Sequence, residues 1–332
     1  MTNGTTKIGI IGYGKMGQIR SAAIEATGRA RVLFVADDAY NGVLPKDCRC
    51  ASADEILGHP HLDAVFICTP NYLNKPFTIR GLQSGKHIFC EKPPAFTSAD
   101  VEEIRAAEAA SGLKLMYGFN HRHHESIQKM KSLIDSEASG KILWMRGRYG
   151  KSVDSTFYEN WRSKKDLAGG GILLDQGIHM LDLFVYLAGD FDEVKAFVSN
   201  LYWNLDIEDN VFAILRDSKT KIVASLHSTM TQWRHLFSLE VFCERGYYVL
   251  NGLRTSSGAY GDEVLSIAKG RTTAPMAASV DDARIVYHVD ESWQSEVDLF
   301  LDAIDTGNPI RIGNSADALK LMRLIDRIYA QQ

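Results

Sequence analysis

The sequence has few cysteines, no long apolar run and no basic run. Its five cysteines among 332 residues are odd in number and form no CxxC pair, so reduced thiols are expected. No window has the apolar length of a membrane span, and the first residues, MTNGTTKIG, lack the basic and apolar regions of a secretory signal. We therefore expect a cytoplasmic protein without a membrane partner.

Charge and size narrow the class further. The formal net charge is -4, and no basic stretch compensates for it, which argues against a nucleic-acid partner. A content of 45% hydrophobic and 23% charged residues is typical of a globular chain. A chain of this length exceeds one ordinary core, so two domains are expected.

The fold class is predicted from a change of pattern near Asn120. Before it, short apolar runs alternate with helical patterns, which indicates a doubly wound parallel sheet; the runs are KIGIIG, RVLFVAD, LDAVFICTP, HIFCEKP and KLMYGFN. After it, longer alternating strands indicate an α+β domain with a large, mostly antiparallel sheet. We predict domains at 1–120 and 121–332, with a C-terminal helix able to pack back on the first domain.

A glycine-rich segment, GYGKMG, follows the first apolar strand and opens a helix. Gly12 permits a tight turn, Gly14 lets a pyrophosphate approach the backbone, and Gly17 lets the helix pack on the strand. With Lys15 and Met16, these residues would present helix N–H groups to a dinucleotide. The alternative is a glycine-rich turn without a ligand.

Polar residues also follow the second and third strands. Asp37, or Asp38 in its place, could accept hydrogen bonds from the adenine ribose, and a carboxylate there favours NAD over NADP. Thr69, Pro70 and Asn71 lie at the ligand-binding edge of the predicted sheet, where Asn71 could bind ribose or pyrophosphate. An ordinary acidic turn and an Asn-containing turn are the alternatives.

The segment EKPP places Glu91, Lys92 and Pro93 after the fourth strand. A partly buried lysine can exchange a proton or hold a substrate hydroxyl, and the neighbouring acid could pair with its ammonium. We predict Glu91 and Lys92 to contact the cofactor. A solvated surface lysine is the alternative.

Asp175 and His179 are four residues apart in GGGILLDQGIHMLD, so they would share one helical face. The carboxylate could orient the imidazole and the pair could relay a proton. A helix cap and a half-buried histidine are the alternative reading.

The histidines of NHRHHES do not have the spacing of a metal site, so no metal is expected. Side chains around this segment and FYENWRSKK could instead contact substrate. The candidates are Arg122, Tyr158, Trp161, Arg162 and Lys165.

Taken together, GYGKMG, CTPN, EKPP, GFNHR and WRSKKDLAGGGILLDQGIHMLD resemble the Gfo/Idh/MocA oxidoreductases over nearly the whole chain. The resemblance implies a Rossmann domain and a C-terminal sheet whose open face forms a homodimer or homotetramer interface. It implies that Lys92 contacts nicotinamide and the reacting oxygen, that His179 is the acid or base, and that Asp175 positions substrate. Asn74 departs from the histidine that many members have there.

The resulting hypothesis is hydride transfer between NAD(H) and a secondary alcohol or ketone of a sugar, cyclitol or nucleotide-linked sugar. Two alternatives remain. One is reduction of a C=N or C=C bond on the same fold, and the other is a non-catalytic NAD-binding sensor.

Overall fold

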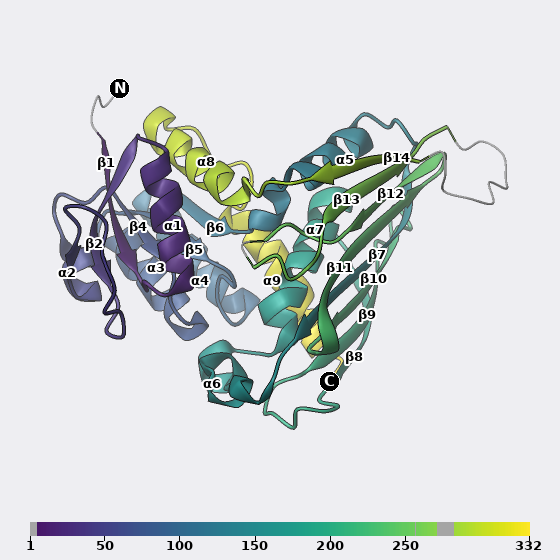
Figure 1. Ribbon diagram of the computed structural model, residues 1–332, viewed down its shortest axis with the longest axis horizontal. Helices are drawn as coiled ribbons and strands as arrows, with labels where there is room; N and C mark the ends of the chain where they lie inside the picture. Colours follow the sequence, from purple (N-terminus) through teal and green to yellow (C-terminus); the bar gives the residue numbers. More distant parts are fainter. Residues whose placement is uncertain (1–4, 256, 271–281) are drawn as a thin grey trace. The chain divides into compact units, whose positions relative to one another are not determined.

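The computed structural model describes residues 5–255, 257–270 and 282–332. Its contacts divide the chain into two compact units, each built from segments that are separated in the sequence. Figure 1 colours the chain from its N-terminus to its C-terminus. The first unit comprises Met1–Asn120, Asp166–Gly169 and Ser292–Met322, and the second comprises His121–Lys165, Gly170–Glu291 and Arg323–Gln332.

The first unit contains a six-stranded, wholly parallel sheet with the order β3-β2-β1-β4-β5-β6. This is the doubly wound arrangement predicted from the apolar runs, and the prediction is confirmed. β1 lies between β2 and β4, at the point where the strand order reverses and ligands bind in such sheets. The strands are β1 (Thr6–Ile11), β2 (Ala30–Ala36), β3 (Arg49–Cys50), β4 (Ala64–Ile67), β5 (His87–Glu91) and β6 (Leu115–Gly118).

A helix from far along the chain completes the core of this unit. Phe300 of α8 (Ser292–Thr306) packs edge-on against Phe66 and Phe89, with ring centroids 5.5 and 5.7 Å apart. The sequence pattern did not predict α8 or its place in the first unit. The other helices of the unit are α1 (Lys15–Ala26), α2 (Ala53–Gly58), α3 (Asn74–Gln83) and α4 (Ser98–Ser111).

The second unit contains an eight-stranded sheet with the order β14-β13-β12-β11-β7-β10-β9-β8. Only the β7–β10 pairing is parallel among these described strands, so the predicted, mostly antiparallel sheet is confirmed. The strands are β7 (Ile142–Ser152), β8 (Glu193–Ser199), β9 (Asn210–Arg216), β10 (Val223–Thr229), β11 (Thr231–Cys243), β12 (Gly246–Asn251), β13 (Glu263–Ala268) and β14 (Ala283–Tyr287).

One face of this sheet is covered by α7 (Ile178–Ala188), which Figure 1 shows lying along it. The approach is close, because a Cβ at Gly147 of β7 would stand 2.4 Å from the side chain of Met180. A π-helical turn, Leu173–Gly177, precedes α7, and Gly189 ends it with a φ of 94°. The remaining helices are α5 (Glu125–Asp135), α6 (Lys165–Ala168) and α9 (Ser315–Tyr329).

Among the described residues, one helical stretch, Lys165–Ala188, is long and apolar enough to span a membrane. Its most apolar window is 72% buried inside the protein. It therefore has the character of a core helix and does not by itself indicate a membrane span.

The opposite face of the sheet presents apolar side chains to solvent. On β9, Phe212 and Ile214 are each 50% exposed, and Phe197 beside them on β8 is 80% exposed. Trp144 of β7 stacks on Phe242 of β11 with centroids 4.2 Å apart. This set of residues is called the outer sheet face below.

Candidate functional site

The glycine-rich segment adopts the tight turn that its sequence predicts. Gly12 has a φ of +87°, and a Cβ there would lie 2.4 Å from the backbone oxygen of Cys68. A Cβ on Gly17 would lie 2.2 Å from the oxygen of Gly12. Gly14 differs, because a Cβ there would meet no protein atom within 4 Å. The protein itself does not require a glycine at 14, so this open space can admit a ligand.

The N-terminus of α1 has features of an anion site. Gly14 is its N-cap, no side chain caps it, and its first turn contains no acid. By contrast, α2 and α4 of the same unit have complete capping boxes, built on Ser52 and Thr97. The first N–H groups of α1 therefore remain for a ligand, and the exposed Lys15 adds positive charge beside them. The chain thus fits the pyrophosphate of a dinucleotide here.

Asp37 lies at the end of β2 and is bonded to this turn. Its carboxylate accepts a hydrogen bond from the backbone N–H of Tyr13 at 2.7 Å and another from that of Ala39 at 3.0 Å. Asp38 is exposed. The predicted contact of either carboxylate with a ribose stays a prediction.

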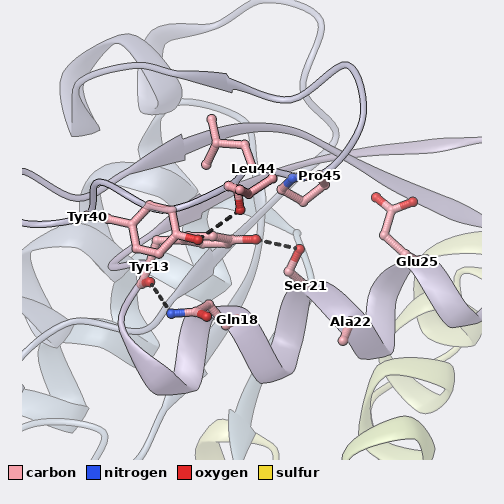
Figure 2. Close-up of a pocket in the computed structure, with 9 residues that line it drawn as sticks. Tyr13, Gln18, Ser21, Ala22, Glu25, Tyr40, Leu44 and Pro45 are labelled. Atoms are coloured by element: carbon pink, nitrogen blue, oxygen red, sulfur yellow. Dashed lines mark hydrogen bonds between the residues drawn. The ribbon is translucent and has the colours of Figure 1, made fainter.

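A cavity of about 360 Å³ adjoins Tyr13. Figure 2 shows the rings of Tyr13 and Tyr40 at one end and Glu25 at the other, with the α1 residues Gln18 and Ser21 along one side. None of the nine described residues that line it is lysine or arginine. A phosphate group in this cavity would meet no cationic lining residue.

Asn74, which departs from the family pattern, has a structural role that the sequence did not reveal. It is fully buried, and its amide donates to the backbone oxygens of Glu91 at 3.2 Å and Pro93 at 2.8 Å. Its side-chain oxygen accepts from Thr69 at 3.1 Å. Asn74 thus joins the segment of Thr69 to the segment EKPP, where it binds the backbone oxygens of the two residues that flank Lys92.

Asn71 is also buried and donates to the backbone oxygen of Ala168 at 2.8 Å. Pro70 is half-buried and directly precedes the short 3-10 turn that Asn71 begins. The predicted contact of this segment with a ribose or pyrophosphate stays a prediction.

The two members of the EKPP segment have different surroundings. Glu91 is 6% exposed, and its carboxylate accepts a hydrogen bond from Arg20 of α1 at 2.7 Å. Lys92 is half-buried. The sequence suggested Lys92 as a possible partner of Glu91, and it did not indicate the bond to Arg20.

In the second unit, Asp175 is held between two cations. Its carboxylate lies 2.8 Å from the ammonium of Lys151 on β7 and 3.5 Å from the guanidinium of Arg162. Lys151 is not among the site residues predicted from the sequence. It lies on β7 and belongs to no recognisable motif, so the sequence does not mark it as a site residue.

His179 belongs to a buried aromatic cluster that also lay outside the prediction. Its ring stacks on His121 with centroids 3.9 Å apart and an interplanar angle of 13°. His121 Nε2 and the hydroxyl of Tyr149 are hydrogen-bonded at 2.9 Å. Tyr149 in turn packs edge-on against Tyr260, with centroids 5.2 Å apart.

Asp175 acts electrostatically on the same two phenols. Burial raises the pKa of Tyr149 and of Tyr260, and the negative charge of Asp175 adds to the rise in each. The acid, the two imidazoles and the two phenols therefore form one polar cluster within the second unit, called the His179 cluster below.

The remaining residues of NHRHHES have structural partners of their own. Arg122 forms a buried ion pair with Asp182 at 2.6 Å, and its guanidinium lies 5.0 Å from the ring centre of Tyr186. His124 pairs with Glu263 at 2.9 Å. The predicted substrate contact of Arg122 stays a prediction.

The other predicted substrate residues lie in the connection after β7. Tyr158 donates to the backbone oxygen of Trp203 at 2.8 Å, and Trp161 lies under the guanidinium of Arg162 at 4.3 Å. Lys165 is exposed. Among the ion pairs of the described residues, Arg162 is the member of this group that pairs with Asp175.

Comparisons with known proteins identify both parts of the chain. Residues 6–119 match the oxidoreductase family with an NAD-binding Rossmann fold, and residues 127–249 match the GFO/IDH/MocA C-terminal domain. Levoglucosan dehydrogenase of Pseudarthrobacter phenanthrenivorans is 36% identical over 43% of this chain and 37% of its own length. The 2,7-anhydro-N-acetylneuraminate hydratase of Escherichia coli is 25% identical over 57% of this chain and 51% of its own.

These alignments span less than two thirds of either relative. A solved structure of levoglucosan dehydrogenase in complex with NADH superposes on 98% of this chain and 96% of that one, with a TM-score of 0.84 and 23% identity. At this identity the superposition establishes a common fold.

Proposed function

Because the chain belongs to the Gfo/Idh/MocA oxidoreductase family, we propose that it is an NAD(H)-dependent dehydrogenase or reductase acting on CH–OH groups. Its substrate would be a secondary alcohol or ketone of a sugar, cyclitol or nucleotide-linked sugar. The observation that carries the cofactor half is the uncapped N-terminus of α1 beside the open space at Gly14. Gly12, Gly17, Lys15 and Met16 would complete this cradle.

A bound nicotinamide supplies hydride exchange, and the protein has to supply orientation and proton transfer. We assign proton transfer to Lys92 and His179, which belong to different units. Asp175, whose charge is compensated by Lys151 and Arg162, can accept a hydrogen bond from a substrate hydroxyl. It would therefore position the substrate while His179 exchanges the proton.

We further propose NAD as the preferred cofactor. Asp37 would accept hydrogen bonds from the ribose diol, and its charge would repel a 2′-phosphate. The cavity beside Tyr13 is lined by Glu25 and by no cationic residue, so it would not favour such a phosphate.

The assembly and compartment are part of the same proposal. The outer sheet face is apolar and exposed, which favours a homodimer or homotetramer formed through it. We propose a cytoplasmic enzyme with a small sugar-like substrate.

The main alternative is different chemistry on the same scaffold. Reduction of a C=N or C=C bond would use the same cradle, and the relative described as a hydratase is similar over about half of its length. A buried imidazole cluster beside a carboxylate favours alcohol chemistry, because proton exchange at a hydroxyl needs such a group. A non-catalytic NAD sensor would not need this cluster.

The test is the absorbance of reduced nicotinamide during mixing of the protein and NAD with a panel of free sugars, cyclitols and nucleotide-linked sugars. A rise identifies the substrate class. Lys92→Ala should lower kcat by roughly 10²- to 10⁴-fold, as loss of a proton-transfer group does. NADH affinity, followed by fluorescence, should be largely retained.

Lys75→Ala is the matched control, because Lys75 lies in the same unit and pairs with Asp100 at 2.7 Å. It should leave turnover unchanged. Full activity of Lys92→Ala on an identified substrate would refute the role assigned to Lys92.

A further inference from the structure

Three buried side chains from separate segments meet in the His179 cluster. His121 follows β6 in a short 3-10 turn, Tyr149 lies on β7, and His179 lies in the first turn of α7. Their exposed fractions are 5%, 2% and 5%. The sequence separates His121 from His179 by more than fifty residues, so only the fold brings the two rings together.

The geometry makes His121 the intermediary between the other two. Its ring lies nearly parallel to that of His179, and its Nε2 is hydrogen-bonded to the Tyr149 hydroxyl. The stack aligns the planes of the two imidazoles. The hydrogen bond to Tyr149 restrains the rotation of the His121 ring within its plane, whichever partner provides the proton.

Packing alone does not require a phenol at position 149. A phenylalanine has nearly the same shape, and burying a hydroxyl costs free energy unless it is hydrogen-bonded. The rings of Phe237 and Tyr260 already contact Tyr149 edge-on, with centroids 5.3 and 5.2 Å away. The hydroxyl therefore adds hydrogen bonds that a phenylalanine could not make, one with His121 and one with Tyr260.

Charge gives the stack a second consequence. Two imidazolium rings with centroids 3.9 Å apart would repel each other strongly in a buried site. The stack therefore disfavours a positive charge on both rings at the same time.

We propose that Tyr149 is a positioning residue for the reaction. By restraining His121, it holds the plane of the His179 ring that stacks on it. The expected loss of turnover rests on the proposed function, whereas the expected effect on the His179 ring does not. It assigns to Tyr149 and His121 roles that the family motifs did not indicate.

The kinetic test is a double-mutant cycle with Tyr149→Phe and His121→Phe. The second change keeps an aromatic ring against His179 but cannot hydrogen-bond to Tyr149. Tyr149→Phe should lower kcat roughly 10- to 100-fold, as misplacement of a reacting group does. Substrate KM and NADH affinity should change much less.

In the His121→Phe background, the same Tyr149→Phe change should have little further effect, because the two residues act as one chain. Tyr248→Phe is the matched control. Tyr248 is likewise buried in the second unit, and its hydroxyl bonds to Ser139 at 2.8 Å. Additive losses in the cycle, or an equal loss in the control, would overturn the proposal.

A measurement without substrate separates this proposal from the proposed function. Nitrogen-15 NMR of the histidine side chains, with His179 assigned by His179→Asn, should show a shifted His179 imidazole in Tyr149→Phe but not in Tyr248→Phe. An unchanged His179 signal in Tyr149→Phe overturns the positioning role. An absence of turnover on every sugar, with that shift present, counts against the proposed function alone.

Discussion

The guanidinium of Arg20 lies 2.7 Å from the carboxylate of Glu91, and it also lies 2.7 Å from the carboxylate of Glu296. Arg20 is fully buried, and its charge lies over the rings of Phe89 and Trp293 at 4.4 and 4.7 Å. These contacts join α1, β5 and α8. The ion pair between Glu91 and Arg20 thus ties the end of β5, directly before Lys92, to α1.

Removing the charge of Arg20 should destabilise the first unit strongly. Arg20→Leu leaves the buried carboxylates of Glu91 and Glu296 without their cation, which typically costs about 3–5 kcal/mol. Urea unfolding at pH 7 should show this loss of unfolding free energy. Arg29→Leu is the control, because the side chain of Arg29 is 38% exposed and pairs with Asp298 and Asp302.

The control should lose about 1 kcal/mol or less. A loss in Arg20→Leu as small as this would mean that the two acids become protonated or hydrated with little cost. The role of the pair in holding the EKPP segment would then be wrong.

The sequence was informative where a local pattern determines the structure. Five of the six parallel strands were found because each is a continuous apolar run, and the turn at Gly12 because its backbone conformation requires glycine. The sixth parallel strand, β3, was missed because it is only two residues long and both are exposed. The features that were found depend on neighbouring residues alone.

Partners from distant segments could not be predicted in the same way. The ion pair of Glu91 with Arg20 could not be predicted, because Arg20 lies on α1 and Glu91 at the end of β5. His121 was considered only as a poor metal ligand, and Tyr149 was not considered at all, because their contact with His179 exists only after three segments pack together. Asn74 was treated as a peripheral departure, although it bonds two backbone carbonyls around Lys92.

Cofactor preference should depend on Asp37. Asp37→Ser removes the charge that would face a 2′-phosphate and weakens the bonds to the ribose diol, so NADH affinity should fall about tenfold while NADPH affinity rises. Fluorescence titration with both cofactors gives the ratio. Asp38→Ser, at the neighbouring exposed carboxylate, should leave the ratio unchanged. A change in the second variant alone would identify Asp38 as the ribose ligand.

Charge on the outer sheet face should disrupt the proposed assembly. Phe212→Glu places a carboxylate on β9, where Phe212 is half-exposed and stacks on His227 with centroids 3.9 Å apart. Burying this charge in an interface would be costly, so sedimentation should show a shift toward monomer. Val43→Glu is the control, at a side chain 92% exposed in the first unit. An unchanged oligomer in Phe212→Glu would place the interface elsewhere.

Stability in acid should depend on Glu263. Its carboxylate accepts hydrogen bonds from Ser126 and from the backbone N–H of Arg254, and it pairs with His124. Burial acts to raise the pKa of Glu263, but these bonds and the charge of His124 outweigh it and lower the pKa below its ordinary value of 4.5. The folded chain therefore binds this proton less readily than the unfolded chain does.

It follows that the carboxylate contributes its full stabilisation above pH 4.5 and loses it as the pH falls through the lower, folded-state value. Glu263→Gln should cost about 1–3 kcal/mol at pH 7, because buried donors lose their charged acceptor. The difference between the two proteins in urea unfolding should shrink below pH 4.5. Glu193→Gln, at a surface pair with Arg216, should show no comparable dependence. A difference that stays constant from pH 7 to pH 3 would mean that Glu263 is already protonated in the folded protein.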